Sequence, residues 1–158
     1  MFKMAVRAVL IVALYILNVA SAEYVNRKFC SNVDHSKCSI HSVQLDPCPD
    51  GPGFCLLRRE KPYRLSFDFT PKFEAAKLQL SVLSDDDNSG NFSTVVLPPH
   101  SACDHQRCPL EDYVRTSYDV DFVFVKKVYG KFPIQMKLWN ELDQSEACCF
   151  TFTVKTLK

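Results

Sequence analysis

Eight cysteines constrain the fold more than any other feature of this 158-residue chain; they are Cys30, Cys38, Cys48, Cys55, Cys103, Cys108, Cys148 and Cys149. An even number of cysteines behind a secretory leader predicts a framework of disulfides formed in an oxidising compartment. Eight cysteines allow roughly a hundred different pairings, so spacing alone leaves their connectivity open.

The first 22 residues match the pattern of a secretory signal peptide. Lys3 and Arg7 supply the positive region, residues 8–20 are mostly apolar, and Ala20-Ser21-Ala22 is a small-residue cleavage site. A membrane anchor is the alternative, but the apolar run is short for a bilayer, which takes about 20 residues. We therefore expect a signal peptide over residues 1–22 and one secreted domain over residues 23–158.

The remainder of the chain carries no strong charge bias. Without Lys3 and Arg7, 17 of the 19 Lys and Arg residues remain beside 18 Asp and Glu residues, a net charge of −1. This balance does not favour a nucleic-acid partner. The sequence also lacks a Gly-x-Ser-x-Gly nucleophile motif, and Asp119 and Asp121 are typical of one solvated strand face. We therefore do not expect an enzyme.

Alternation of apolar and polar residues predicts short strands over residues 40–45, 63–69, 77–82, 117–128, 134–138 and 150–154. Residues 140–145 are expected to form a hairpin loop, and residues 74–77 are the one weakly helix-like stretch. Strands of this number and spacing predict an all-β antiparallel sandwich or barrel.

The expected inward side chains are mostly large; they are Phe67, Phe69, Leu78, Leu80, Phe122, Phe124, Met136, Leu138 and Phe152. A packed core is the ordinary explanation for such residues. An apolar cavity would use the same residue types, and periodicity does not separate the two.

Residues 100–108 contain two histidines and two cysteines, a set that could hold zinc in a closed tetrahedral site. In a secreted chain, however, a Cys103–Cys108 disulfide is the stronger expectation. We predict no metal and no cofactor.

Cys148 and Cys149 are adjacent in the last predicted strand. Neighbouring residues of a strand point to opposite faces, so the two sulfurs must reach different partners. Cys30 and Cys38 are the candidates. Either bond would close a loop of about 100 residues or more, worth roughly 4–5 kcal/mol in the chain-entropy model.

The cysteines and their flanking residues follow an order that resembles the ML lipid-recognition domain. The order runs through Phe29-Cys30, Val43-Gln44-Leu45-Asp46-Pro47-Cys48-Pro49, Cys55-Leu56, residues 63–71, Cys103, Cys108-Pro109, residues 125–129, residues 136–143 and Cys149. Within this family it is most similar to the soluble sterol-transfer proteins of the Niemann-Pick type C group. Mite group-two allergens and the lipid-binding co-receptors of Toll-like receptors are more distant relatives.

The resemblance implies an immunoglobulin-like β-sandwich of two antiparallel sheets with a lipid cavity between them. It also implies three disulfides, Cys48–Cys55, Cys103–Cys108 and Cys30–Cys149. Cys38 and Cys148 are additions to the family pattern, and we expect them to form a fourth. An exchange of partners between Cys30 and Cys38 stays open.

The resemblance also transfers lipid-lining positions. Val125 and Tyr129 fall on a pair that lines the pocket mouth, although the family's Tyr-Pro is here Tyr129-Gly130. An aromatic gate of the family falls at Val95 or Val96, where valine would widen the entrance. With the inward positions, the expected lipid-binding set is Phe67, Phe69, Leu80, Val95, Val96, Phe124, Val125, Tyr129, Met136 and Leu138.

The function implied is a monomeric secreted or lumenal lipid carrier, with sterol favoured and a membrane protein as acceptor or receptor. The alternatives are a phospholipid or fatty-acid carrier and an innate-immunity recognition protein for microbial lipids, which Lys126, Lys127 and Lys131 near the mouth would suit. The sequon at Asn91 lies in a polar stretch and predicts a glycosylated loop. A glycan is compatible with a lysosomal destination.

Overall fold

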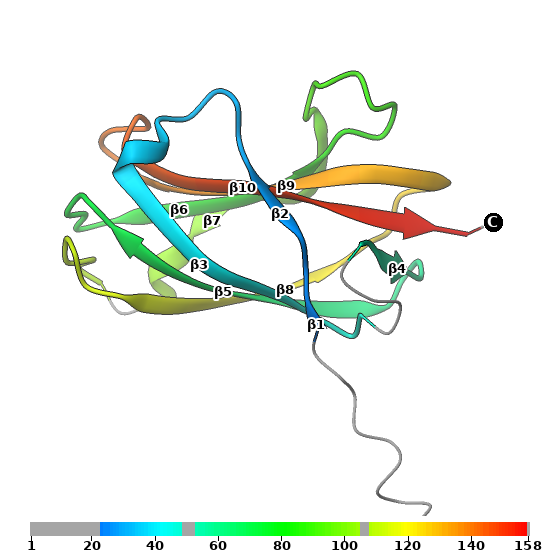
Figure 1. Cartoon of the computed structure of the whole chain (residues 1–158), viewed down its shortest axis with the longest axis horizontal. Helices are drawn as coiled ribbons and strands as arrows, with labels where there is room; N and C mark the ends of the chain where they lie inside the picture. The colour runs from blue at the N-terminus through cyan, green and yellow to red at the C-terminus, as the bar shows by residue number, and fades with distance from the viewer. Residues whose placement is uncertain (1–22, 49–52, 105–107, 158) are drawn as a thin grey trace, which may run out of the picture.

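Two β-sheets stacked face to face make up the described part of the chain, as Figure 1 shows. The computed structural model describes residues 23–48, 53–104 and 108–157. The expected signal peptide lies outside these residues. No helix within the described ranges is long and apolar enough to cross a membrane.

The first sheet has four strands in the order β1-β3-β5-β8, all antiparallel. Their bounds are β1 Glu23–Tyr24, β3 Cys38–Asp46, β5 Pro62–Pro71 and β8 Thr116–Val123. Strand β5 alternates strictly between buried and partly exposed residues, as the sequence predicts for a strand with one wet face. Its neighbours align Val43 and Tyr118 with Phe67, so these three residues face the same interior.

The second sheet has six strands, with the path β2-β10-β9-β6-β7 and β4 paired to β10. Only β4 runs parallel to its partner. The bounds are β2 Arg27–Phe29, β4 Cys55–Leu57, β6 Leu78–Ser84, β7 Thr94–Ser101, β9 Gly130–Asn140 and β10 Ala147–Thr156. Short 3-10 turns occur at η1 His35–Lys37 and η2 Ala102–Asp104.

Four disulfides staple the sandwich: Cys30–Cys149, Cys38–Cys148, Cys48–Cys55 and Cys103–Cys108. This is the pairing that the resemblance implied, together with the expected fourth bond. Cys148 lies opposite the inward Leu138 and joins β10 to β3 across the two sheets. Cys149 lies opposite Lys137 on the outer face and bonds to Cys30, just after β2. The adjacent cysteines therefore serve opposite faces of one strand.

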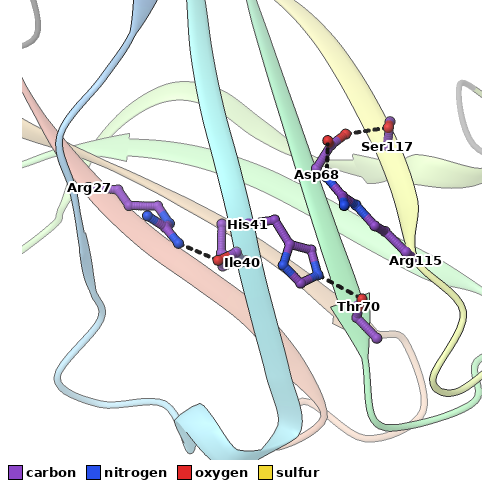
Figure 2. A network of polar contacts seen from close by, with 7 residues as sticks. All are labelled: Arg27, Ile40, His41, Asp68, Thr70, Arg115 and Ser117. Carbon is purple, nitrogen blue, oxygen red and sulfur yellow. Dashed lines mark hydrogen bonds and ion pairs between the residues drawn. The ribbon is translucent and has the colours of Figure 1, made fainter.

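Figure 2 shows a network of polar contacts on the two sides of β3. The Asp68 carboxylate accepts hydrogen bonds from the Ser117 hydroxyl and, at 3.0 Å, from the Arg115 guanidinium. These contacts join β5 to β8. They lower the pKa of Asp68, the Ser117 hydrogen bond being the larger cause. At the other side of β3, a guanidinium nitrogen of Arg27 donates to the carbonyl of Ile40 and so links β2 to the opposite sheet.

Three expectations about elements need correction. The strand expected over residues 117–128 ends at Val123, because its partner β5 begins opposite it at Pro62 and offers no further ladder. Residues 74–77 are not helical: Ala75 forms an isolated bridge with Leu110, with N–H···O bonds of 3.1 and 2.8 Å. The weak strand over residues 40–45 is the full nine-residue β3, flanked on both sides. The hairpin loop between β9 and β10 is confirmed.

Candidate functional site

The interior between the sheets is a single apolar cluster to which both sheets contribute. Phe67 is its centre: its ring contacts Tyr118 at 5.6 Å in the same sheet and Phe150 of the opposite sheet at 5.4 Å between centroids. Toward one end, Phe124 packs on Phe132 at 5.5 Å. Aromatic pairs at these separations attract beyond the area they bury.

The two sheets touch directly across this interior. The Phe67–Phe150 contact leaves no ligand-sized gap between those two rings. At this point the two rings occupy the space expected for the lipid cavity, since an empty apolar gap would lose packing contacts. A ligand can enter there only if the sheets move apart or the rings change rotamer.

The two edges of the sandwich differ in how they are closed. At one edge the Cys38–Cys148 disulfide joins β3 to β10, and the chain itself passes from β1 in one sheet to β2 in the other (Figure 1). At the opposite edge, β7 and β8 are the last strands of their sheets and no ladder pairs them. The chain crosses between the sheets here too, through the connection that carries the Cys103–Cys108 disulfide. A groove of about 460 Å³ lies there, with Leu97 and Val120 among its lining.

Residues 124–129, which follow β8, form a lip that is anchored to the core at two points. The buried Phe124 holds one end, and its carbonyl accepts a 2.9 Å hydrogen bond from the N–H of Glu60. The half-buried Val128 packs on the core, and its carbonyl accepts the hydroxyl of Thr156.

The remaining side chains of this lip face solvent. Val125 is 56% exposed and Tyr129 is 54% exposed. Lys126 and Lys127, both exposed, join Arg59 around a groove of about 250 Å³. The lip therefore combines apolar side chains with a local excess of positive charge. Such a surface suits an interface between apolar and anionic groups.

Lys131 does not belong to this basic group. Its ammonium lies 4.2 Å from the ring centre of Phe54, and Lys155 lies 5.7 Å from the same ring. Lys131 and Lys155 are paired residues of β9 and β10. Lys131 therefore has an aromatic contact of its own and does not line the groove that Lys126 and Lys127 line.

The structure brings six of the expected lipid-binding residues together in the buried core: Phe67, Phe69, Leu80, Phe124, Met136 and Leu138. Val96 is half-buried and packs against this core. Val95 is 45% exposed and lies opposite Leu83, whose side chain lines a groove on the outer face. Val125 and Tyr129 lie on the lip.

Tyr118 is a candidate that sequence reasoning missed. It lies on β8, its side chain is buried, and its hydroxyl has no hydrogen-bond partner among the residues that the structure describes. Burial raises the pKa of this hydroxyl to about 12, with a smaller contribution from the charge of Asp104. The only sequence signal was its inward position, two residues before Val120 in the alternating strand.

A separate groove of about 670 Å³ crosses the outer face of the six-stranded sheet. Phe29, at the end of β2, lies at one side of this groove, and the loop between β6 and β7, which carries Asn91, lies at the other. In Figure 1 this loop and the loop that follows β2 both rise from the six-stranded sheet. Its floor includes Lys137 and Thr151. Burial lowers the pKa of Lys137. Asn91 itself is exposed.

Residues that the sequence offered as candidates for catalysis or metal binding form structural contacts instead. The Asp121 carboxylate accepts two hydrogen bonds from Arg64, at 2.8 and 3.0 Å, on the outer face of β5 and β8. This pair raises the pKa of Arg64. Cys103 and Cys108 form a disulfide, so neither thiol is available to zinc. His105, one of the two histidines weighed as zinc ligands before the disulfide was preferred, lies outside the described residues.

Comparison with known proteins agrees with this architecture. The chain is 29% identical to an MD-2-related lipid-recognition protein of Manduca sexta over 130 residues, which is 82% of this chain and 83% of the relative. A Niemann-Pick type C2 protein from the Japanese carpenter ant superposes with a TM-score of 0.61 at 18% identity, covering 83% of this chain and 98% of the other. Chicken MD-1, solved in complex with lipid IVa, gives a TM-score of 0.54 at 16% identity over 85% of this chain and 96% of the other.

The structural matches share the fold at low identity, whereas the family match is made on the sequence itself. The family model of the ML domain matches residues 25–156, which include every described strand except β1 and all four disulfides. On this match, the chain is a member of the ML domain family.

Proposed function

We propose that this protein is a secreted, non-enzymatic lipid carrier that holds one apolar ligand between its sheets, with a sterol as the favoured ligand. The observation that carries the proposal is the continuous apolar interior, closed by a disulfide at one edge and unpaired at the other. The Manduca relative is named for lipid recognition and chicken MD-1 was solved with lipid IVa, which supports the same ligand class.

Burial of apolar surface would drive binding. A lipid gains about 0.8 kcal/mol for each CH₂ removed from water. Against this stands the loss of contacts such as Phe67–Phe150 when the sheets move apart. The Cys38–Cys148 bond keeps one edge together during that movement, so we expect the β7–β8 edge to open. The expected lining residues Val96, Phe67 and Met136 would then meet the ligand.

The lip would guide entry and release. Val125 and Tyr129 offer apolar contact at the surface, and Lys126 and Lys127 would hold the lip near anionic lipid headgroups. The same basic groove supports a second candidate, recognition of an anionic microbial lipid for a receptor. In that case the phosphate groups of the lipid would bind Arg59 and the two lysines.

Secretion and glycosylation belong to this proposal. Four disulfides fit an oxidising compartment, and the exposed Asn91 sequon fits N-glycosylation there. Mass spectrometry of protein secreted from eukaryotic cells should find an N-terminus at Glu23 and a glycan at Asn91 that Ser93→Ala removes. A secreted protein without the glycan would contradict the modification but not the carrier function.

The carrier function is tested with the same secreted protein. Its bound lipid is extracted and identified, and a fluorescent sterol is then titrated and displaced with unlabelled cholesterol. We expect one sterol per chain. Recovery of multi-acyl anionic lipid without sterol binding would favour the recognition function instead. If no lipid is recovered and no sterol binds, the carrier proposal is wrong.

A further inference from the structure

The groove of about 670 Å³ on the outer face of the six-stranded sheet has a floor built from four strands. The register aligns one row of residues across this floor: Lys28, Thr151, Gln135 and Leu83, all of which line the groove. Neighbouring strands lie about 4.8 Å apart, so the row spans about 14 Å. A cleft of this volume and length accommodates a ligand of the size of a disaccharide.

Gln135, in the middle of that row, is a polar side chain without a partner. It is 8% exposed and lines the groove, and no group among the described residues forms a hydrogen bond with its amide. A side-chain amide that is more than nine-tenths buried normally has such a partner. Its neighbour Thr151 is half-buried and lines the groove as well. The floor therefore presents an amide and a hydroxyl to whatever fills the groove.

The sequon at Asn91 stands at the rim of the same groove. Asn91 is exposed and lines the groove, as does the following residue, Phe92. Hydrogen bonds fix the loop that carries them: the Asp85 carboxylate accepts the N–H of Gly90 at 2.8 Å, and the Asp85 N–H donates to the Pro133 carbonyl of β9 at 3.1 Å. The attachment point for a glycan is thus held at a fixed place relative to the floor.

The lining of the groove matches the chemistry of the first sugars of an N-glycan. Sugar rings have apolar faces that pack on aromatic side chains, and neutral hydroxyl and acetamido groups that need hydrogen-bond partners. Phe92 offers aromatic surface beside Asn91, and Phe29, 48% exposed, offers it at the opposite side. Gln135 and Thr151 offer the hydrogen-bond partners between the two rings.

A covalent tether makes weak contacts sufficient to fill the groove. A group linked at the edge of its site is present there at an effective concentration of about 1 mM. An intrinsic dissociation constant of about 0.3 mM then keeps the groove filled for about three-quarters of the time. A free ligand of the same chemistry lacks this advantage, so the attached glycan is the occupant that the geometry favours.

We propose that the glycan at Asn91 folds back into this groove, where its first two N-acetylglucosamine rings pack between Phe29 and Phe92 and hydrogen-bond the Gln135 amide. The glycan is then part of the outer face of the six-stranded sheet rather than a solvated appendage. This inference rests on the glycosylation in the proposed function and adds where the sugars lie and what they contact. It does not depend on which lipid the interior holds.

Acetylation of Lys137 reports whether the groove is filled, because this half-buried lysine lines it. Secreted wild type is compared with Ser93→Ala, which removes the sequon at a residue outside the lining. We expect Lys137 to react about fourfold more slowly in the glycosylated protein, the reduction for a groove that is open about a quarter of the time. Lys126, on the lip, is the internal standard and should react equally in both proteins.

Asp143→Asn provides a matched control, because it turns Asp143-Gln144-Ser145 into a sequon in the exposed hairpin between β9 and β10. None of these three residues lines the groove, and the hairpin lies at the other end of β6 from the Asn91 loop (Figure 1). In the Ser93→Ala background, the relocated glycan should leave Lys137 as reactive as in Ser93→Ala alone. Equal slowing by either glycan would show general shielding and overturn the inference.

Two further variants test the contacts themselves. Gln135→Met removes the amide and keeps the length of the side chain, and Phe29→Ala removes one aromatic wall. Each should bring the ratio of Lys137 rates with and without the glycan close to one. In the Ser93→Ala background, Gln135→Met should unfold at the same or a higher denaturant concentration, because the amide has no protein partner. A clear loss of stability there would overturn the inference.

The outcomes keep this inference apart from the carrier function. If mass spectrometry finds no glycan at Asn91, or if Lys137 reacts at the same rate in wild type and Ser93→Ala, the inference is wrong. Sterol titration of the two proteins tests the carrier function separately, and we expect equal affinities. Failure of both proteins to bind sterol, with Lys137 still protected by the glycan, would reject the carrier function and support the position of the glycan.

Discussion

The two long-range disulfides should stabilise the fold in a strongly non-additive way. Cys30–Cys149 and Cys38–Cys148 span 119 and 110 residues, but their ends are neighbours in the chain. Once either bond has formed, the other closes only a small ring, made of residues 30–38 and the adjacent pair 148–149. The chain-entropy model gives about 4.8 kcal/mol for the long loop and about 2.7 kcal/mol for a ring of about ten residues.

Removal of one bond therefore leaves the long loop closed by the other. Each cysteine pair replaced by alanine should cost about 2.7 kcal/mol, and replacement of both pairs should cost about 7.5 kcal/mol. The loss in the double replacement exceeds the sum of the single losses by about 2 kcal/mol. Loss of buried sulfur packing adds to each single value but largely cancels from this difference.

Denaturant unfolding of the wild type, the two single-pair replacements and the double replacement measures this coupling. Because typical domains are stable by only about 5–15 kcal/mol, all four are compared in the same concentration of sucrose, which favours the folded state. The fluorescence of Trp139, the single tryptophan, reports unfolding. Single losses that simply add up in the double replacement would refute the reasoning, because the two bonds would then constrain different parts of the unfolded chain.

Two other predictions follow from charged groups. The Ser117 hydroxyl and a neighbouring guanidinium lower the pKa of Asp68 below its ordinary 3.8, so its contribution to stability is present above that pH and is lost as the pH falls through the native pKa. Asp68→Asn should therefore reduce the loss of stability on acidification below about pH 4, measured by denaturant unfolding at each pH; an unchanged acid limb would contradict this. Reversal of charge at Lys126 and Lys127 should slow sterol transfer to anionic vesicles at low salt without changing sterol affinity, whereas the same reversal at Lys131 should have little effect. If reversal at Lys131 slowed sterol transfer as much as reversal at Lys126 or Lys127, the net charge of the protein rather than the lip would explain the effect.

Most of the framework could be predicted from local rules. Alternation placed the central strands correctly, and the adjacency of Cys148 and Cys149 required partners on opposite faces, as the two bonds show. Strand β7 was not predicted, because Pro98 and Pro99 argue against a strand. It exists because it is an edge strand, and because Pro98 and Pro99 lie where its pairing with β6 is irregular and have no partner in the ladder.

The candidate site was harder to predict because it depends on register and on the opposite sheet. Irregular pairing of β6 with β7 sets Val95 opposite Leu83, toward the outer face, which no alternation in residues 94–101 would indicate. The sequence also could not predict that the Tyr118 hydroxyl has no hydrogen-bond partner among the described residues, because such a partner would come from other strands or loops. Strand pattern identifies a buried tyrosine but not what its hydroxyl meets.

The most direct test of binding between the sheets uses two residue types that occur once each in residues 23–158. After removal of residues 1–22, Met136 is the only methionine, and its side chain is buried in the interior. Trp139, the only tryptophan, lies on the outer face, where the Lys137 ammonium is 5.5 Å from its ring. In an NMR titration with cholesterol, the Met136 methyl signal should be replaced by a new one that is complete at one sterol per chain, while the Trp139 indole signal stays in place. A shift of Trp139 with an unchanged Met136 signal would contradict the account, because the lipid would then bind on the outside of the sandwich.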